Sequence, residues 1–137
     1  MIIGFTAGAF DLCHAGHVLM LRECKEHCDK LIVGLHVDPS IERPTKNKPV
    51  QTLVERYIQL KGLSYVDEII PYETEKDLTD ILSAVKIHVR FIGGDYVNVD
   101  NFTGKSLCES LGIEIFYNSR NHRFSSSELR KRIEEAK

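Results

Sequence analysis

Short apolar runs alternate along the chain with stretches in which apolar residues recur at the spacing of one helix face. The runs are rich in β-branched and aromatic residues and are bounded by Gly, Asp, Asn or Pro. They predict five strands, over residues 2–6, 31–37, 68–71, 89–92 and 113–117. The stretches between and after them predict five helices, over residues 16–27, 52–63, 77–85, 103–111 and 126–136.

Strand and helix alternate from one end of the sequence to the other. This order predicts an α/β fold, a single Rossmann-like domain over residues 1–137 with a five-stranded parallel sheet and helices on both faces. No repeat, low-complexity tract or Pro/Gly-rich linker divides the chain. Sheets of this type bind ligands at the carboxyl ends of their strands, where the strand order reverses.

Composition and charge exclude several classes of protein. The 137 residues include 18 Lys plus Arg and 20 Asp plus Glu, a formal charge of −2, and 42% of them are apolar. This balance gives no long-range field for nucleic acid or anionic lipid. No apolar run approaches ~20 residues, and no positive region precedes the apolar amino terminus, so we expect a cytoplasmic protein without a membrane span or signal peptide.

Four cysteines are too few and too irregularly spaced for a disulfide scaffold. The spacing of Cys24 and Cys28, with His27 between them, could bring two zinc ligands together, but the sequence shows no second ligand pair. We expect free thiols that pack as small apolar groups.

The strongest chemical signal is TAGAFDLCHAGH at residues 6–17, directly after the first predicted strand. Gly8 lets the backbone turn sharply and approach a ligand. His14 and His17 are three residues apart, so both imidazoles lie on one side of the first turn of a helix that begins near them. Free N–H groups and the positive end of the helix dipole favour a phosphate there. Isolated pairs of this kind are usually surface residues; the surrounding pattern favours the phosphate site.

A second pattern, RNHRFSSSELR at residues 120–130, precedes the last predicted helix. Ser125 or Ser126 can cap that helix, and Glu128 can complete a capping box. In the simple interpretation, this pattern only caps the helix. In the functional interpretation, the hydroxyls and N–H groups at the helix start, preceded by Arg120, also form a binding site for phosphate.

Together, TxGxFDxxHxGH, R(x)4-S-[ST]-[ST] and the segment YVDEIIP at residues 65–71 resemble the small cytidylyltransferases, in particular the glycerol-3-phosphate type. These enzymes belong to the nucleotidyltransferase superfamily that has HxGH where class I aminoacyl-tRNA synthetases have HIGH. The resemblance covers nearly the whole chain. HxGH is specific for nucleotidyl transfer, and the carboxyl-terminal pattern favours CTP.

The resemblance implies a role for each motif. The residues implied in catalysis are His14, His17, Asp11, Lys46 and Arg120. Asp11 would place the acceptor, or a metal-bound water, near the α-phosphate. Arg56 and Arg123 are further candidates for acceptor binding, and Arg43 and Lys48 are alternatives to Arg56. The residues implied in nucleotide binding are Gly8, Ala9, Phe10, His14, Ala15, Gly16, His17, Lys46, Gly94, Asp95, Arg120, Phe124, Ser125, Ser126 and Ser127.

The implied reaction is an in-line displacement at the α-phosphate of CTP. A phosphate oxygen of a small phosphorylated acceptor attacks, pyrophosphate leaves, and a CDP-linked product forms. His14 and His17 would stabilise the pentacoordinate state, while Lys46 and Arg120 neutralise the leaving pyrophosphate. Mg²⁺ is expected, bound mainly through the CTP phosphates, with no protein ligand assigned to it.

Departures from the glycerol-3-phosphate enzymes concern the acceptor. Pro44, Ser64 and Asp77 stand where those enzymes have lysine, arginine and lysine, so three cations that could hold a small phosphate are missing. Arg123 replaces a glycine of the carboxyl-terminal motif. The acceptor is therefore glycerol 3-phosphate or another small phosphorylated molecule, such as a phospho-amino acid or phospho-alcohol of surface-polysaccharide assembly.

Two alternatives remain open. The FSSS at residues 124–127 also resembles the end motif of the ATP-using phosphopantetheine adenylyltransferases. A non-catalytic nucleotide sensor on the same fold is the other alternative; the retention of both histidines, Lys46 and Arg120 argues against it. The resembling family is commonly dimeric, so we expect a homodimer, with an interface over residues 60–66.

Overall fold

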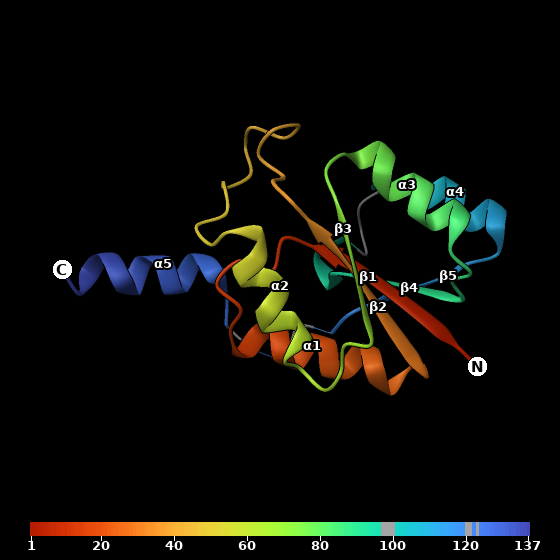
Figure 1. Cartoon of the computed structure of the whole chain (residues 1–137), viewed down its shortest axis with the longest axis horizontal. Helices are drawn as coiled ribbons and strands as arrows, with labels where there is room; N and C mark the ends of the chain where they lie inside the picture. The colour runs from red at the N-terminus through yellow and green to blue at the C-terminus, as the bar shows by residue number, and fades with distance from the viewer. Residues whose placement is uncertain (97–100, 120–121, 123) are drawn as a thin grey trace.

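The computed structural model describes residues 1–96, 101–119, 122 and 124–137. Its centre is a five-stranded parallel sheet in the order β3-β2-β1-β4-β5 (Figure 1). The strands are β1 (Ile3–Gly8), β2 (Lys30–His36), β3 (Glu68–Tyr72), β4 (Val89–Ile92) and β5 (Glu114–Tyr117). The helices are α1 (Ala15–Glu26), α2 (Leu53–Lys61), α3 (Glu75–Ala84), α4 (Lys105–Leu111) and α5 (Ser126–Glu135), and a 3₁₀ turn, η1, covers Gly94–Tyr96.

The predicted α/β fold is confirmed, and the differences lie at the ends of elements. β1 extends past its predicted end at Thr6 because Ala7 and Gly8 continue the pairing with β2. α3 begins before its predicted start because Thr74 caps it. The Thr74 hydroxyl accepts from the Asp77 N–H at 3.0 Å, and the Asp77 carboxylate accepts from the Thr74 N–H at 3.1 Å. The periodicity of apolar residues does not indicate such polar caps, so it placed the start of α3 too late.

Helices cover both faces of the sheet (Figure 1). On the face of α1 and α2, the core includes Leu21 and Leu60. On the face of α3 and α4, it includes Leu82 and Cys108. Burying one such leucine side chain contributes about 1.5–3 kcal/mol, so these two layers fix the sheet that carries the site.

All four cysteines are free thiols, as expected. Cys24 and Cys108 are fully buried, and burial raises the pKa of Cys24 to about 12. Both therefore pack as small apolar groups. Within the described ranges, no three His, Cys, Asp or Glu side chains are grouped to hold a metal ion. No described helix is long and apolar enough to cross a bilayer.

The strand order reverses between β1 and β4. The chain first places β2 and β3 on one side of β1, then returns to add β4 and β5 on the other. The crossover connections leave a crevice at the carboxyl ends of β1 and β4, which is the ligand-binding position in folds of this type.

α5 differs from the other helices. It projects away from the sheet (Figure 1), and none of its residues is buried. Its amino-terminal end lies beside the loop after β1, where the Ser126 hydroxyl donates to the Asp11 carbonyl at 3.2 Å. The start of α5 therefore belongs to the crevice, while its later turns extend away from the body of the protein.

Candidate active site

His14 and His17 form the polar start of α1. His14 is the N-cap, and its Nδ1 accepts from the Gly16 N–H at 2.9 Å. The His17 Nδ1 accepts from the His14 N–H at 3.2 Å, and the two ring centroids are 4.1 Å apart. Because each Nδ1 is an acceptor, these hydrogen bonds assign the proton of each neutral ring to Nε2. Among the described residues neither Nε2–H group has a hydrogen-bond partner, so both can serve a ligand.

Burial controls the charge of this pair. It lowers the pKa of His17 to about 4, with a smaller contribution from the neighbouring His14 and an opposing one from Asp11. Burial also lowers the pKa of His14, and His122 adds to that shift. Both rings are therefore neutral at pH 7 in the free protein and act as hydrogen-bond donors rather than as fixed cations.

Gly16 allows a third imidazole to approach. A Cβ at this position would lie 2.7 Å from the His14 Cε1 and 2.9 Å from the His122 Cε1, closer than non-bonded carbon atoms approach each other. The His122 ring stacks on Phe124, with centroids 5.4 Å apart, and its Nδ1 accepts from the Phe124 N–H at 3.1 Å. The glycine of HxGH therefore leaves room for His122 beside His14.

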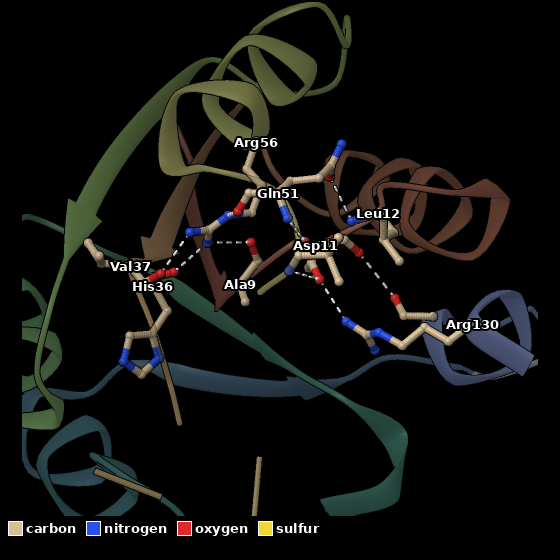
Figure 2. A network of polar contacts seen from close by, with 10 residues as sticks. Ala9, Asp11, Leu12, His36, Val37, Gln51, Arg56 and Arg130 are labelled. Atoms are coloured by element: carbon tan, nitrogen blue, oxygen red, sulfur yellow. Dashed lines mark hydrogen bonds and ion pairs between the residues drawn. The ribbon is translucent and has the colours of Figure 1, made fainter. Parts of the chain in front are cut away.

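Asp11 is held in a polar network rather than presented to a ligand (Figure 2). Its carboxylate accepts from the backbone N–H groups of Val50 and Gln51, both at 2.9 Å, and from the Arg130 Nη2 at 2.6 Å. The residue is only 7% exposed. Its carboxylate therefore joins the loop after β1, the start of α2 and α5, and the placement of the acceptor by Asp11 stays a prediction.

Arg56 is committed to the backbone as well (Figure 2). Its guanidinium donates to the carbonyls of Ala9 at 3.0 Å, of His36 and Val37 at 2.7 Å each, and of Gln51 at 3.2 Å. It is 2% exposed and braces the ends of β1 and β2. Its role in acceptor binding stays a prediction.

These contacts support a constrained loop. Phe10 and Leu12 have φ of 50° and 51°, in the left-handed region that disfavours side chains. The Leu12 N–H donates to the Gln51 Oε1 at 2.8 Å, and Phe10 is buried against His17, with ring centroids 5.5 Å apart. The network around Asp11 thus holds the turn that leads from β1 to the histidines.

Three adjoining cavities lie along the crevice. The histidine cavity, about 250 Å³, lies between the starts of α1 and α5 and is lined by His14, His17, Ser125 and Ser126, among others. The central cavity, about 280 Å³, shares His17 with it. The outer cavity, about 460 Å³, shares Arg90 with the central one. Because neighbours share walls, the cavities form one cleft across the point where the strand order reverses.

Most residues predicted to bind nucleotide line this cleft. The ones in the histidine and central cavities are Gly8, Ala9, Phe10, His14, Gly16, His17, Gly94, Phe124, Ser125 and Ser126. Lys46 lines the outer cavity instead. Ala15 and Ser127 are exposed and are not among the lining residues.

The roles of all these residues stay predictions, and for three of them the structure adds little. Arg120 and Arg123 lie outside the described residues, and Asp95 belongs to η1. The turn that carries Asp95 is closely packed, because a Cβ at Gly94 would lie 2.4 Å from the Asn118 carbonyl oxygen.

The sequence reasoning assigned no role to His122 or Arg130. His122 lies inside the motif of residues 120–127, but its approach to His14 depends on the fold. Arg130 follows Ser126 by four residues and therefore shares its helix face, which is a readable signal. The sequence could not show that this helix face points back to Asp11, with which Arg130 forms an ion pair.

The fold, the HxGH helix start and the serine-capped α5 define a nucleotidyltransferase of the HxGH superfamily. The sequence model of the cytidylyltransferase-like family matches residues 5–132, and the chain belongs to this family.

Individual relatives agree with that assignment. The chain is 40% identical over 111 residues to the Bifunctional protein HldE of Acidiphilium cryptum, covering 80% of this chain and 22% of that protein. It is 32% identical over 134 residues to the protein of the same name from Aliarcobacter butzleri, covering 97% of this chain and 27% of that protein. The chain thus spans about a quarter of the length of these relatives.

A solved structure shares the architecture. The lipopolysaccharide core biosynthesis protein from Thermoplasma volcanium superposes with a TM-score of 0.74 at 28% identity, covering 89% of this chain and 99% of that chain.

Proposed function

We propose that the chain transfers a nucleotidyl group from CTP to a small phosphorylated acceptor and releases pyrophosphate. The observation that carries this proposal is the meeting of two capped helix starts at the histidine cavity. α1 contributes two imidazoles with free Nε2–H groups, and α5 contributes Ser125 and Ser126. Two helix starts give donors and positive dipole ends for a polyphosphate at one place.

In the proposed reaction, a phosphate oxygen of the acceptor forms a bond to the α-phosphorus. The bond from that phosphorus to the bridging oxygen of the β-phosphate breaks, and pyrophosphate takes the electron pair. The Nε2–H groups of His14 and His17 donate to the oxygens that gain negative charge. Both rings donate as neutral imidazoles, because each Nδ1 already accepts from a backbone N–H.

The remaining groups have supporting roles. Lys46 and Arg120 stay the proposed partners of the phosphates that leave. Asp11, Arg56 and Arg130 brace the ends of β1 and β2 and the start of α5. Mg²⁺ bound to the triphosphate would screen its charge. The side-chain donors that face the histidine cavity are mainly imidazoles and hydroxyls, which suits a metal held by the nucleotide.

Similarity to a lipopolysaccharide core biosynthesis protein supports an acceptor from surface-polysaccharide assembly. The FSSS motif at residues 124–127 makes ATP the second candidate nucleotide. Pyrophosphate release measured with CTP and ATP in parallel, over a panel of phosphorylated acceptors with Mg²⁺, tests both points. Acceptor-dependent release with CTP supports the proposal. Preference for ATP would replace the cytidylyl assignment, and no release with either nucleotide would favour a sensor.

A cytoplasmic homodimer also remains a proposal. In the stretch at residues 60–66, Leu60 is fully buried, and the partly buried Leu63, Tyr65 and Val66 pack against the same core. The outer face of α2 is the better site for a subunit contact, since Val54 and Ile58, one helical turn apart, are 65% and 63% exposed. Light scattering after chromatography should give a dimer for the natural chain and a monomer for Ile58→Glu.

A further inference from the structure

Glu23, in the second half of α1, joins this helix to the end of β5. Its carboxylate accepts from the Asn118 Nδ2 at 2.9 Å and from the Ser119 backbone N–H at 2.8 Å. The Ser119 hydroxyl is a third donor to the same carboxylate. These partners are 95 and 96 residues away in the sequence, so only the folded chain brings them together. We call this set of contacts the Glu23 anchor.

Both sides of the Glu23 anchor are attached to the core. On α1, the neighbouring Cys24 is fully buried. Directly after β5, Asn118 is 6% exposed, and its backbone N–H donates to the Ile92 carbonyl at 2.7 Å. Ser119, the next residue, is exposed. Its position therefore depends on hydrogen bonds to Glu23 rather than on burial.

The charge of Glu23 strengthens the anchor. Burial raises the pKa of this carboxyl, but the hydrogen bonds from Ser119 and Asn118 outweigh burial and hold the pKa below its ordinary value, with a smaller contribution from His27. The side chain is therefore ionised at pH 7. Hydrogen bonds to an ionised acceptor are roughly twice as strong as those between neutral groups.

The anchored residue stands directly before the motif at residues 120–127. Ser119 lines the histidine cavity together with Ser126 of that motif. Near the other end of the motif, the Ser126 hydroxyl donates to the Asp11 carbonyl at 3.2 Å. The chain is thus held on both sides of the motif, by Glu23 before it and by the loop after β1 at its end.

We propose that Glu23 is a positioning residue for nucleotide binding, which sets the carboxyl-terminal side of the histidine cavity against the start of α1. Glu23 lines a neighbouring cavity of about 180 Å³ and is not among the residues that line the histidine cavity. It therefore acts through Ser119. This assignment rests on the proposed function and adds to it a residue that lies outside both motifs.

The expected consequence is a change in affinity rather than in the chemical step. Without the Glu23 anchor, the chain after β5 can leave its position in several directions. The apparent affinity for nucleotide then falls in proportion to the fraction of molecules in the competent arrangement. A bound nucleotide contacts the motif and holds it in place, so kcat should change little.

The test separates the length of the side chain from its charge. Glu23→Gln keeps the length and two polar atoms, whereas Glu23→Asp keeps the charge but is too short to reach both partners. With the nucleotide that supports turnover, Glu23→Asp should raise the KM for nucleotide about tenfold and change kcat by less than about twofold. Glu23→Gln should change that KM by less than about threefold.

Glu26→Asp is the matched control. Glu26 lies on the same helix, lines the same neighbouring cavity and is paired with the exposed Arg22 at 3.9 Å, so its shortening should leave the KM unchanged. Thermal unfolding of each variant accompanies the kinetics. An unchanged KM in folded Glu23→Asp would overturn the assignment. An equal rise in Glu23→Gln would also overturn it, because charge rather than position would then be the property that matters.

If the natural chain shows no turnover, the proposed function fails, and calorimetric titration with CTP and with ATP decides the role of Glu23. Weaker nucleotide binding by Glu23→Asp than by Glu23→Gln and Glu26→Asp would still support a positioning residue. Equal binding by the three variants, or no binding by the natural chain, would reject it.

Discussion

The starts of α1 and α5 face the same cavity but are supported in different ways. α1 is anchored by Leu21 and Cys24, both fully buried in the core. α5 has no buried residue, and its contacts with Asp11 come from Ser126 and Arg130. Few buried apolar contacts mean low local stability. The proposed chemistry therefore lies on a rigid element. The carboxyl-terminal part of the proposed nucleotide site depends instead on a small polar joint, the contacts of Ser126 and Arg130 with Asp11.

The largest effect should come from removing an imidazole on the rigid side. His14→Ala should lower kcat by about 10²–10³-fold, because it removes a donor to the developing charge. It also removes the N-cap, at a cost of about 1 kcal/mol in the free energy of unfolding. His14→Asn is the matched control, since asparagine can cap α1 but brings no imidazole. If His14→Asn retained normal turnover, the proposed role of His14 would be wrong.

The pH dependence of the free energy of unfolding should report the protonation of His17, the more buried of the two histidines. The pKa of His17 is about 4 in the folded protein against 6.5 as its ordinary value. Between these two pH values the unfolded chain therefore binds more protons than the folded chain. The contribution of His17 to the free energy of unfolding is complete above pH 6.5 and is lost as the pH falls toward 4. The difference of 6.5 − 4 = 2.5 pKa units corresponds to about 3 kcal/mol.

Urea unfolding of the natural chain and of His17→Gln, measured at several pH values between 4 and 7, checks this prediction. The variant should show a shallower decline in unfolding free energy on acidification. Parallel declines in the two proteins would mean that His17 is not the group that resists protonation.

The polar joint should show a smaller effect, on binding rather than on folding. Arg130→Ala removes the 2.6 Å contact with Asp11 and should raise the KM for nucleotide about tenfold, since a charge-assisted hydrogen bond contributes about 1.5–3 kcal/mol. The thermal midpoint should barely change, because α5 buries nothing. Arg132→Ala, on an exposed part of the same helix, is the control. A large fall in the thermal midpoint instead would show that the joint supports the fold.

The sequence predicted the fold well, because the spacing of apolar residues directly indicates buried strands and amphipathic helices. It also located the HxGH helix start, since the two histidines and the glycine are local to one turn. It did not show the hydrogen bonds of Asp11 and Arg56, whose partners, backbone groups and for Asp11 also Arg130, are brought close only by folding. Spacing shows that a charged residue is present, but not whether its hydrogen-bonding capacity is already used. The contact of His122 with the site was missed for the same reason.

The smallest effect is expected at the far end of α5. Ile133 is 56% exposed, so Ile133→Gln should change the free energy of unfolding by less than about 0.5 kcal/mol. Leu21→Ala, in the buried part of α1, should cost about 2–5 kcal/mol. Denaturant unfolding of both variants at the same protein concentration measures the contrast. A cost at Ile133 comparable to that at Leu21 would show that α5 is covered in solution, for example by a second subunit.

The central claim is nucleotidyl transfer at the histidine cavity, and mass spectrometry of the reaction product tests it most directly. The natural chain, incubated with CTP, Mg²⁺ and a panel of phosphorylated acceptors, should form a product with the mass of a CMP group added to one acceptor. The His14→Asn protein, folded to the same extent, should form almost none. A natural chain that yields no such product, or a variant that yields as much as the natural chain, would contradict the claim.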